Sequence, residues 1–227
     1  MQLIKTQYYY TIVTIAACLL LCGYCKSQAV TRLPGENAET FVRRVFTIED
    51  ELPHPVIETA EWDTAKKVII FFKRFDDGNI GYLLTPVENN TYATTIIDSF
   101  FELGGEGFPV IETVFFANAD KDSAREIIVM IKARGRWPKF SEKYGEGFYY
   151  DNYVYDNPVI QTPAARLHHF EELSDKLSAG FEGSLYRSKD GKFIKKETAK
   201  YKDVASIRAA LKQMGYAVMP PSFKSSH

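Results

Sequence analysis

Short apolar runs, rich in β-branched and aromatic residues, alternate with turn-forming residues over much of this chain. The run from 67 to 73 is followed by Asp76-Asp77-Gly78-Asn79, and another apolar run begins at Ile80. An Asp-Gly pair between two such runs is typical of a β-hairpin. Glu88-Asn89-Asn90-Thr91 marks the next turn, and further runs follow at 92–97, 110–116, 127–131 and 149–155. The aromatic content of 14% also favours strands.

The pattern changes to a helical period after residue 161. Thr162-Pro163 is typical of a helix start, and Gly180 of a helix end. Between them, apolar residues recur at helical spacing: Leu167, Phe170, Leu173 and Leu177. A second such set begins after Asp203, a capping residue, and comprises Val204, Ile207, Leu211 and Met214.

These patterns predict an α+β fold that is mostly β, in which antiparallel hairpins are followed by two C-terminal helices. The hairpins could form one sheet, a sandwich or a propeller-like array. We expect a flexible lead-in over 30–39, a β-rich domain over 40–160 that begins with a strand at 40–48, a helical segment over 161–217 and a disordered tail over 218–227.

The N-terminal segment predicts export. Lys5 is followed by an uncharged, mostly apolar stretch over 8–23 and then by Ser27-Gln28-Ala29, a small-x-small cleavage pattern. These are the parts of a secretory signal peptide, which we place at 1–29. Two alternatives remain open: an uncleaved helix anchor, and lipidation at Cys18, which follows a lipobox-like Ile15-Ala16-Ala17. The protein is therefore expected to be periplasmic or secreted, or else anchored to the membrane by its N-terminus.

Composition and missing motifs exclude several functions. All three cysteines (Cys18, Cys22 and Cys25) lie in the N-terminal segment, so a processed chain would have no disulfide, thiolate metal site or cysteine nucleophile. The formal net charge of -1 offers no basic field to attract nucleic acid. The sequence contains no nucleophile elbow, zinc-protease motif, phosphate loop or dinucleotide fingerprint. We expect no catalytic residues and no enzyme activity.

An acidic loop lies between the runs at 110–116 and 127–131. Calcium in proteins takes six to eight oxygen ligands, and alternate side chains of a curled loop can supply several of them. The candidate ligands are Asn118, Asp120, Asp122, the Ala124 carbonyl and Glu126. The other interpretation is a turn whose Asn and Asp side chains cap backbone N–H groups. A bound calcium would be structural and would hold the loop closed.

This loop resembles those of the FG-GAP and VCBS-type β-repeats, in which acidic residues alternate before an apolar strand. The loop departs from that pattern in three ways: Ser123 stands where those repeats have a glycine, Asn118 stands where they have an acid, and Lys121 and Arg125 put positive charge beside the site. The strand at 148–156 resembles the one that follows such a loop in small exported bacterial β-domains, including periplasmic inhibitors of invertebrate-type lysozyme. The resemblance covers residues 110–157 and implies an envelope protein that binds a partner.

The tyrosine-rich strand at 149–155 is the candidate partner-binding surface. Side chains of a strand alternate between its two faces. One face would carry Tyr149, Asp151, Tyr153 and Tyr155. Such a half-apolar, hydrogen-bonding face could bind protein or glycan, or could lie at the edge of a β-sandwich core. The adjacent His168 and His169 would point about 100° apart on a helix, so we interpret them as a solvated helix face.

Together, these features predict an exported binding protein of the bacterial envelope, such as an inhibitor or immunity-type partner of a lytic enzyme. One alternative is a structural module stabilised by calcium and without a dedicated ligand. Another is a glycan hydrolase, which would need two carboxylates at a separation set by the fold. The expected partner is a protein or glycan of the envelope, not nucleic acid.

Overall fold

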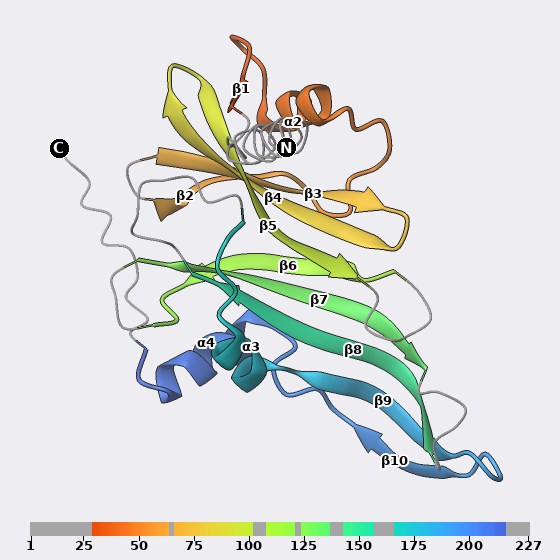
Figure 1. Cartoon of the computed structure of the whole chain (residues 1–227). Coiled ribbons are helices and arrows are strands. Elements are labelled where there is room, and N and C mark those ends of the chain that lie inside the picture. Colours follow the sequence, from red (N-terminus) through yellow and green to blue (C-terminus); the bar gives the residue numbers. More distant parts are fainter. Residues whose placement is uncertain are drawn as a thin grey trace, which may run out of the picture.

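Two five-stranded antiparallel sheets pack face to face (Figure 1). The computed structural model describes residues 29–63, 66–101, 108–120, 124–136, 143–156 and 166–216. Sheet A has the order β1-β5-β4-β3-β2 and comprises β1 (Ala29–Thr31), β2 (Ile57–Asp63), β3 (Lys66–Phe75), β4 (Gly78–Glu88) and β5 (Thr91–Phe101). Sheet B has the order β10-β9-β8-β7-β6 and comprises β6 (Val110–Ala117), β7 (Glu126–Arg136), β8 (Lys143–Tyr155), β9 (Gly180–Arg187) and β10 (Phe193–Glu197). The expected α+β, mostly β class is confirmed, and the hairpins form a sandwich.

Helices cover the outer face of each sheet. Helix α2 (Ala38–Phe46) lies on sheet A, and α3 (Glu171–Leu177) and α4 (Val204–Gln213) lie on sheet B. The core between the sheets takes alternate residues of β3 and β7, namely Val68, Ile70, Phe72, Ile127, Val129 and Ile131. The residues between them face the helices: Ile69, Phe71, Ile128 and Met130. The molecule therefore has four layers: helix, sheet, sheet, helices.

Helix α2 corrects the strand expected at 40–48. Its apolar residues Ala38, Phe41 and Val42 are buried against sheet A and recur at helical spacing. Asn37 caps the helix, because its side chain accepts a hydrogen bond from the Thr40 amide at 2.8 Å. The strand prediction was wrong because this periodicity outweighs the β propensity of the aromatic and β-branched residues.

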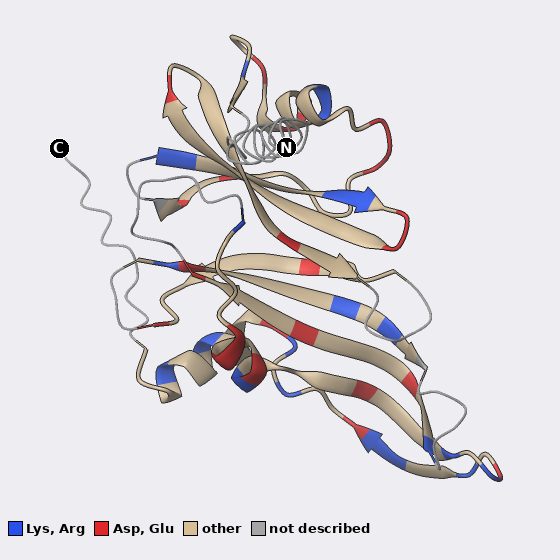
Figure 2. Cartoon of the chain, in the orientation of Figure 1, with Lys and Arg blue, Asp and Glu red and all other residues tan. Residues whose placement is uncertain are grey.

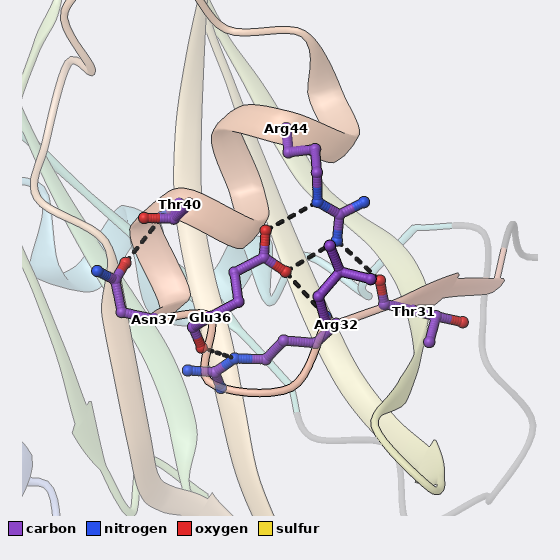
Figure 3. A network of polar contacts seen from close by, with 7 residues as sticks. Thr31, Arg32, Glu36, Asn37, Thr40 and Arg44 are labelled. Atoms are coloured by element: carbon purple, nitrogen blue, oxygen red, sulfur yellow. Dashed lines mark hydrogen bonds and ion pairs between the residues drawn. The ribbon is translucent and has the colours of Figure 1, made fainter.

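The lead-in expected to be flexible is tied to sheet A and α2 (Figure 3). β1 pairs with β5, and Arg44 donates to both carboxylate oxygens of Glu36, each at 2.8 Å. Arg44 also donates to the Thr31 carbonyl at 3.0 Å, and Arg32 donates to the Glu36 carbonyl at 2.7 Å. Glu36 and the two arginines thus join the end of β1 to the surface of α2.

Two expected hairpins, β3–β4 and β4–β5, are confirmed at the sites with the clearest turn-forming residues. Asp76 and Asp77 join β3 to β4, with Phe75 opposite Gly78. Asn89 and Asn90, which join β4 to β5, both have positive φ (30° and 62°). Positive φ at both central residues is the geometry that matches the twist of a hairpin.

The C-terminal segment is less helical than expected. Residues 161–217 include α3 and α4, but they also supply β9 and β10, which complete sheet B. The helix start expected at Thr162-Pro163 lies outside the described residues. Of the helix expected after it, residues 166–170 are extended, and helix α3 begins at Glu171. The predicted signal peptide (1–29) lies outside the described residues except for Ala29, the first residue of β1, and the predicted tail (218–227) lies wholly outside them. Among the described residues, no helix has the length and apolar character needed to span a membrane.

Replacing Glu36 should change the pH dependence of stability. The hydrogen bonds from Arg44 lower the pKa of Glu36 to about 2, from an ordinary value of 4.5. A carboxyl with a lowered folded pKa stabilises the fold above pH 4.5, and this stabilisation is lost as pH falls from 4.5 towards 2. In urea titrations, Glu36→Gln should be less stable than wild type at pH 7, and the difference should shrink across this window. A difference that is independent of pH would contradict this account, and Glu39→Gln on the same helix is the control.

Removing the side chain of Asn152 should loosen the helical layer of sheet B. This residue of β8 is 1% exposed and donates from Nδ2 to the carbonyls of Leu177 (2.7 Å) and Tyr201 (2.9 Å). Asn152→Ala leaves two acceptors without their donor and should lower the free energy of unfolding by about 1–3 kcal/mol. The exposed Gln213→Ala, measured in the same urea titrations, should change it by less than about 0.5 kcal/mol. If the two substitutions lower the free energy of unfolding equally, then Asn152 does not hold the helical layer on sheet B.

Candidate functional site

An extended segment, Arg166–Phe170, closes the seam between the two sheets. β1 pairs with β5 only at 91–93, and β9 pairs with β8 only at 143–150, so the following residues of β5 and β8 have open edges. The segment bonds to both edges. The Leu167 amide donates to the Ile96 carbonyl, and the Phe170 amide donates to the Val154 carbonyl, each at 2.8 Å. It therefore satisfies backbone groups that the short neighbouring strands leave unpaired.

A cleft of about 640 Å³ opens along this seam. It is lined by Asp98 of β5 and by the segment that leads into α3: Arg166, Leu167, His168, His169, Phe170 and Glu171. Its wall thus brings together a guanidinium, two imidazoles and two carboxylates. A cleft of this volume is large enough for a small ligand or for a protruding side chain of a partner protein.

Asp98 is the central acceptor of the cleft. Its Oδ1 accepts a hydrogen bond from Arg166 Nη1 at 2.8 Å, and its Oδ2 accepts one from the Tyr155 hydroxyl at 3.0 Å. The Tyr155 side chain is fully buried, and this burial, reinforced by the nearby Asp98 carboxylate, raises its pKa well above the usual range. Tyr155 therefore stays protonated and donates, which fixes the carboxylate. Arg166 remains 54% exposed, so it can contact a ligand.

His169 is held from behind by aromatic rings and by Ser174. The ring centroids of Tyr153 and Tyr155 lie 5.6 and 5.4 Å from that of His169. Ser174 Oγ donates to the Phe170 carbonyl and accepts from the Val154 amide, both at 3.0 Å, and it lies 2.9 Å from His169 Nε2. With the hydroxyl proton directed at the Phe170 carbonyl, a neutral His169 carries its own proton on Nε2.

The tyrosine strand lies behind this cleft. The predicted alternation is confirmed: Tyr153 and Tyr155 face the core between the sheets, while Tyr150 and Val154 face the helices. Tyr155 is therefore a core residue, which acts on the cleft through Asp98 and His169 and offers no surface of its own.

The rest of this face is also partly buried. The Tyr149 ring covers Gly135 of β7, where any side chain would collide with it, and lies 5.1 Å from the ring of Phe181. Burial raises the pKa of Asp151. Tyr149, Asp151 and Tyr153 each keep some exposed surface.

The sequence did not point to the cleft residues. His168 and His169 were assigned to a solvated helix face, which is wrong because both precede α3 and one pairs with β8. Asp98 and Arg166 are 68 residues apart and come together only through the seam. The signal that the sequence offers is the charge of Asp98 directly after the apolar run 92–97.

The acidic loop joins β6 to β7 near the end of β8. Within the loop, Asn118, Asp120 and Ala124 are half-buried, and Asp122 lies outside the described residues. Glu126, the first residue of β7, is fully buried. The Glu126 carboxylate accepts a hydrogen bond from the Ala119 amide, which is the capping role of the turn interpretation.

A third carboxylate joins this loop. Oxygens of Asp120, Glu126 and Asp156 lie within 4.8 Å of one another. Asp156 comes from the end of β8, because the register pairs Ile127 with Tyr155 and so places the neighbouring residues together. The spacing of oxygen-bearing residues along the loop does not point to Asp156. Pairing β7 with β8 as a hairpin would place Asp156 beside Glu126.

Comparison with known proteins finds no family model, no curated protein and no solved structure that matches this chain.

Calcium should stabilise the fold through the acidic triad of Asp120, Glu126 and Asp156. Three clustered carboxylates repel one another, and a bound cation would reverse that repulsion. Thermal melting should show a midpoint that rises with calcium, by the equivalent of about 2.7 kcal/mol at a hundredfold excess over Kd. The response should vanish in Asp120→Asn with Asp156→Asn.

The matched control replaces the exposed pair in the β3–β4 turn, Asp76→Asn with Asp77→Asn, and should retain the response. A wild-type midpoint that is unchanged by millimolar calcium would remove the calcium interpretation.

Proposed function

We propose that this chain is an exported binding protein of the bacterial envelope and that the seam cleft is its recognition site. The observation that carries the proposal is the Arg166–Asp98–Tyr155 chain of hydrogen bonds. The buried Tyr155 hydroxyl orients the Asp98 carboxylate, and this carboxylate in turn holds the exposed Arg166 guanidinium where the two sheets meet. Preorganised charged groups of this kind favour binding because little side-chain entropy is lost when the partner arrives.

Binding fits the cleft better than catalysis does. Its polar groups are already engaged: Asp98 accepts three hydrogen bonds, from Arg166, Tyr155 and the Ser99 amide, and the Ser174 hydroxyl is used by three partners. A nucleophile needs a free pair of electrons directed at the substrate, and the engaged Ser174 hydroxyl does not offer one. The exposed His168 suits hydrogen bonding to a partner.

The partner that we propose is a protein, a lytic enzyme for which the chain acts as inhibitor or immunity-type partner. The support is the N-terminal export pattern together with the resemblance of residues 110–157 to small exported β-domains. The mixed charge of the cleft suits a partner loop that carries both a carboxylate and a donor.

The test is capture from envelope extracts, followed by titration of the captured protein. Arg166→Ala with His168→Ala should weaken binding at least about fivefold, the loss expected when an interface hot spot is truncated. Arg74→Ala with Lys67→Ala, which removes exposed charges from sheet A, should bind like wild type. If the two double variants bind equally well, or if the wild type captures nothing, the proposal fails.

A second candidate is a structural module stabilised by calcium, and the acidic triad favours it. This module would show the calcium-dependent melting described above and would retain no partner through the cleft. The two functions are compatible with one fold, so the melting and capture experiments distinguish them independently.

A further inference from the structure

The β9–β10 ribbon ends in a basic, partly apolar tip. We call residues Arg187–Lys196 the basic ribbon; its turn lies at the end of sheet B away from α3 and α4 (Figure 1). β10 is an edge strand, and its first two residues are exposed: Phe193 by 60% and Ile194 by 37%. The pairing register shifts between Phe193 and Lys195, so Ile194 falls at the irregularity. Such irregularities re-aim side chains at sheet edges.

The ribbon concentrates positive charge in a chain whose overall formal net charge is -1 (Figure 2). It holds five basic residues, Arg187, Lys189, Lys192, Lys195 and Lys196, against the single acid Asp190. Arg187 pairs with Asp190, and Lys195 with Glu197. Within the described residues the other three lysines have no ion pair, so their ammonium groups are available to an anionic partner.

An aromatic row runs inward from the ribbon across three strands. Phe193 of β10 contacts Tyr186 of β9 edge-on at 6.0 Å, and Tyr186 stacks on Tyr144 of β8 at 5.3 Å. Because the two tyrosines stack on each other, their ring faces do not form a flat platform for a sugar ring. An apolar body with a polar tip instead suits the boundary between lipid tails and water.

Protection of the edge strand explains only part of this pattern. Lysines on an edge strand discourage pairing with other chains. The neighbouring Phe193 and Ile194 would have the opposite effect, since exposed apolar residues on an edge promote association. A soluble acidic partner would likewise satisfy the lysines and leave this apolar pair in water.

A bilayer with anionic headgroups accommodates both features. Phosphates would meet the lysines while Phe193 and Ile194 enter the acyl boundary below them. We propose that the basic ribbon docks the protein onto membranes that contain anionic phospholipid. This docking is peripheral and is separate from any N-terminal anchor and from the seam cleft.

A tryptophan introduced at position 193 tests the proposal in the full chain. Phe193→Trp would be mixed with vesicles of brominated phosphatidylcholine, with or without phosphatidylglycerol, because bromine quenches only tryptophan that enters the acyl region. The wild type, with Trp62 and Trp137, gives the background. Phe75→Trp is the matched control, since Phe75 is 42% exposed at the end of a hairpin in sheet A and precedes Asp76 and Asp77.

Quenching of the Phe193→Trp variant above background should require phosphatidylglycerol, and the Phe75→Trp variant should stay at background. Each lysine near an anionic surface contributes about fivefold to partitioning. Adding Lys192→Glu with Lys196→Glu to Phe193→Trp should therefore reduce partitioning at least about 25-fold. All variants change exposed residues, and their thermal midpoints verify folding.

The opposite results overturn the proposal. The proposal fails if the Phe193→Trp variant is quenched no more than background. It also fails if the two tryptophan variants are quenched equally, or if neutral vesicles quench Phe193→Trp as well as anionic ones do. Binding to soluble dextran sulfate without quenching on vesicles also overturns it, because the ribbon would then be a site for soluble polyanions.

Discussion

The architecture depends on burying two strands on both of their faces. Residues Val68–Phe72 of β3 and Ile127–Ile131 of β7 are at most 1% exposed, so side chains on each side of each strand are removed from water. Antiparallel sheets commonly leave one face to solvent, and near-continuous apolar runs belong to strands that are covered twice. Packing the sheets together covers one face of each run. The other faces require α2 on sheet A, and α3 with α4 on sheet B.

The seam follows from the lengths of the edge strands. β1 has three residues and β9 begins opposite Tyr150, so parts of β5 and β8 lack a neighbouring strand on one side. Unpaired edges invite association with other chains, and a covering segment prevents it. Residues 166–170 provide that cover and, in doing so, place Arg166 against Asp98. The charged cleft is thus a product of closing the sandwich.

The sequence predicted best what local chemistry determines. Asp-Gly and Asn-Asn turns fixed the β3–β4–β5 hairpins, and alternation placed Tyr153 and Val154 on opposite faces. Prediction from the sequence failed where contacts between distant segments determine the local structure. Residues 166–170 carry part of a helical apolar pattern, but the open edges of β5 and β8 hold them extended. The same limit applies to Asp156, which joins Asp120 and Glu126 only through the β7–β8 register, and to Asp98, whose partners come from sheet B and the closing segment.

One long strand connects the two surfaces that carry charge. β8 has 13 residues, a contour length of about 40 Å. Its first half pairs with β9 beside the basic ribbon, and its last residues lie behind the seam cleft. Side chains on both faces hold this strand: Tyr149 fills the space above Gly135, and Asn152 bonds the helical layer. These contacts hold the half of β8 that lies nearer the cleft, whereas Lys143, Glu146 and Phe148 in the half beside the ribbon are exposed. A partner in the cleft and a surface at the ribbon would therefore be connected by one continuous strand that is held firmly at its cleft end.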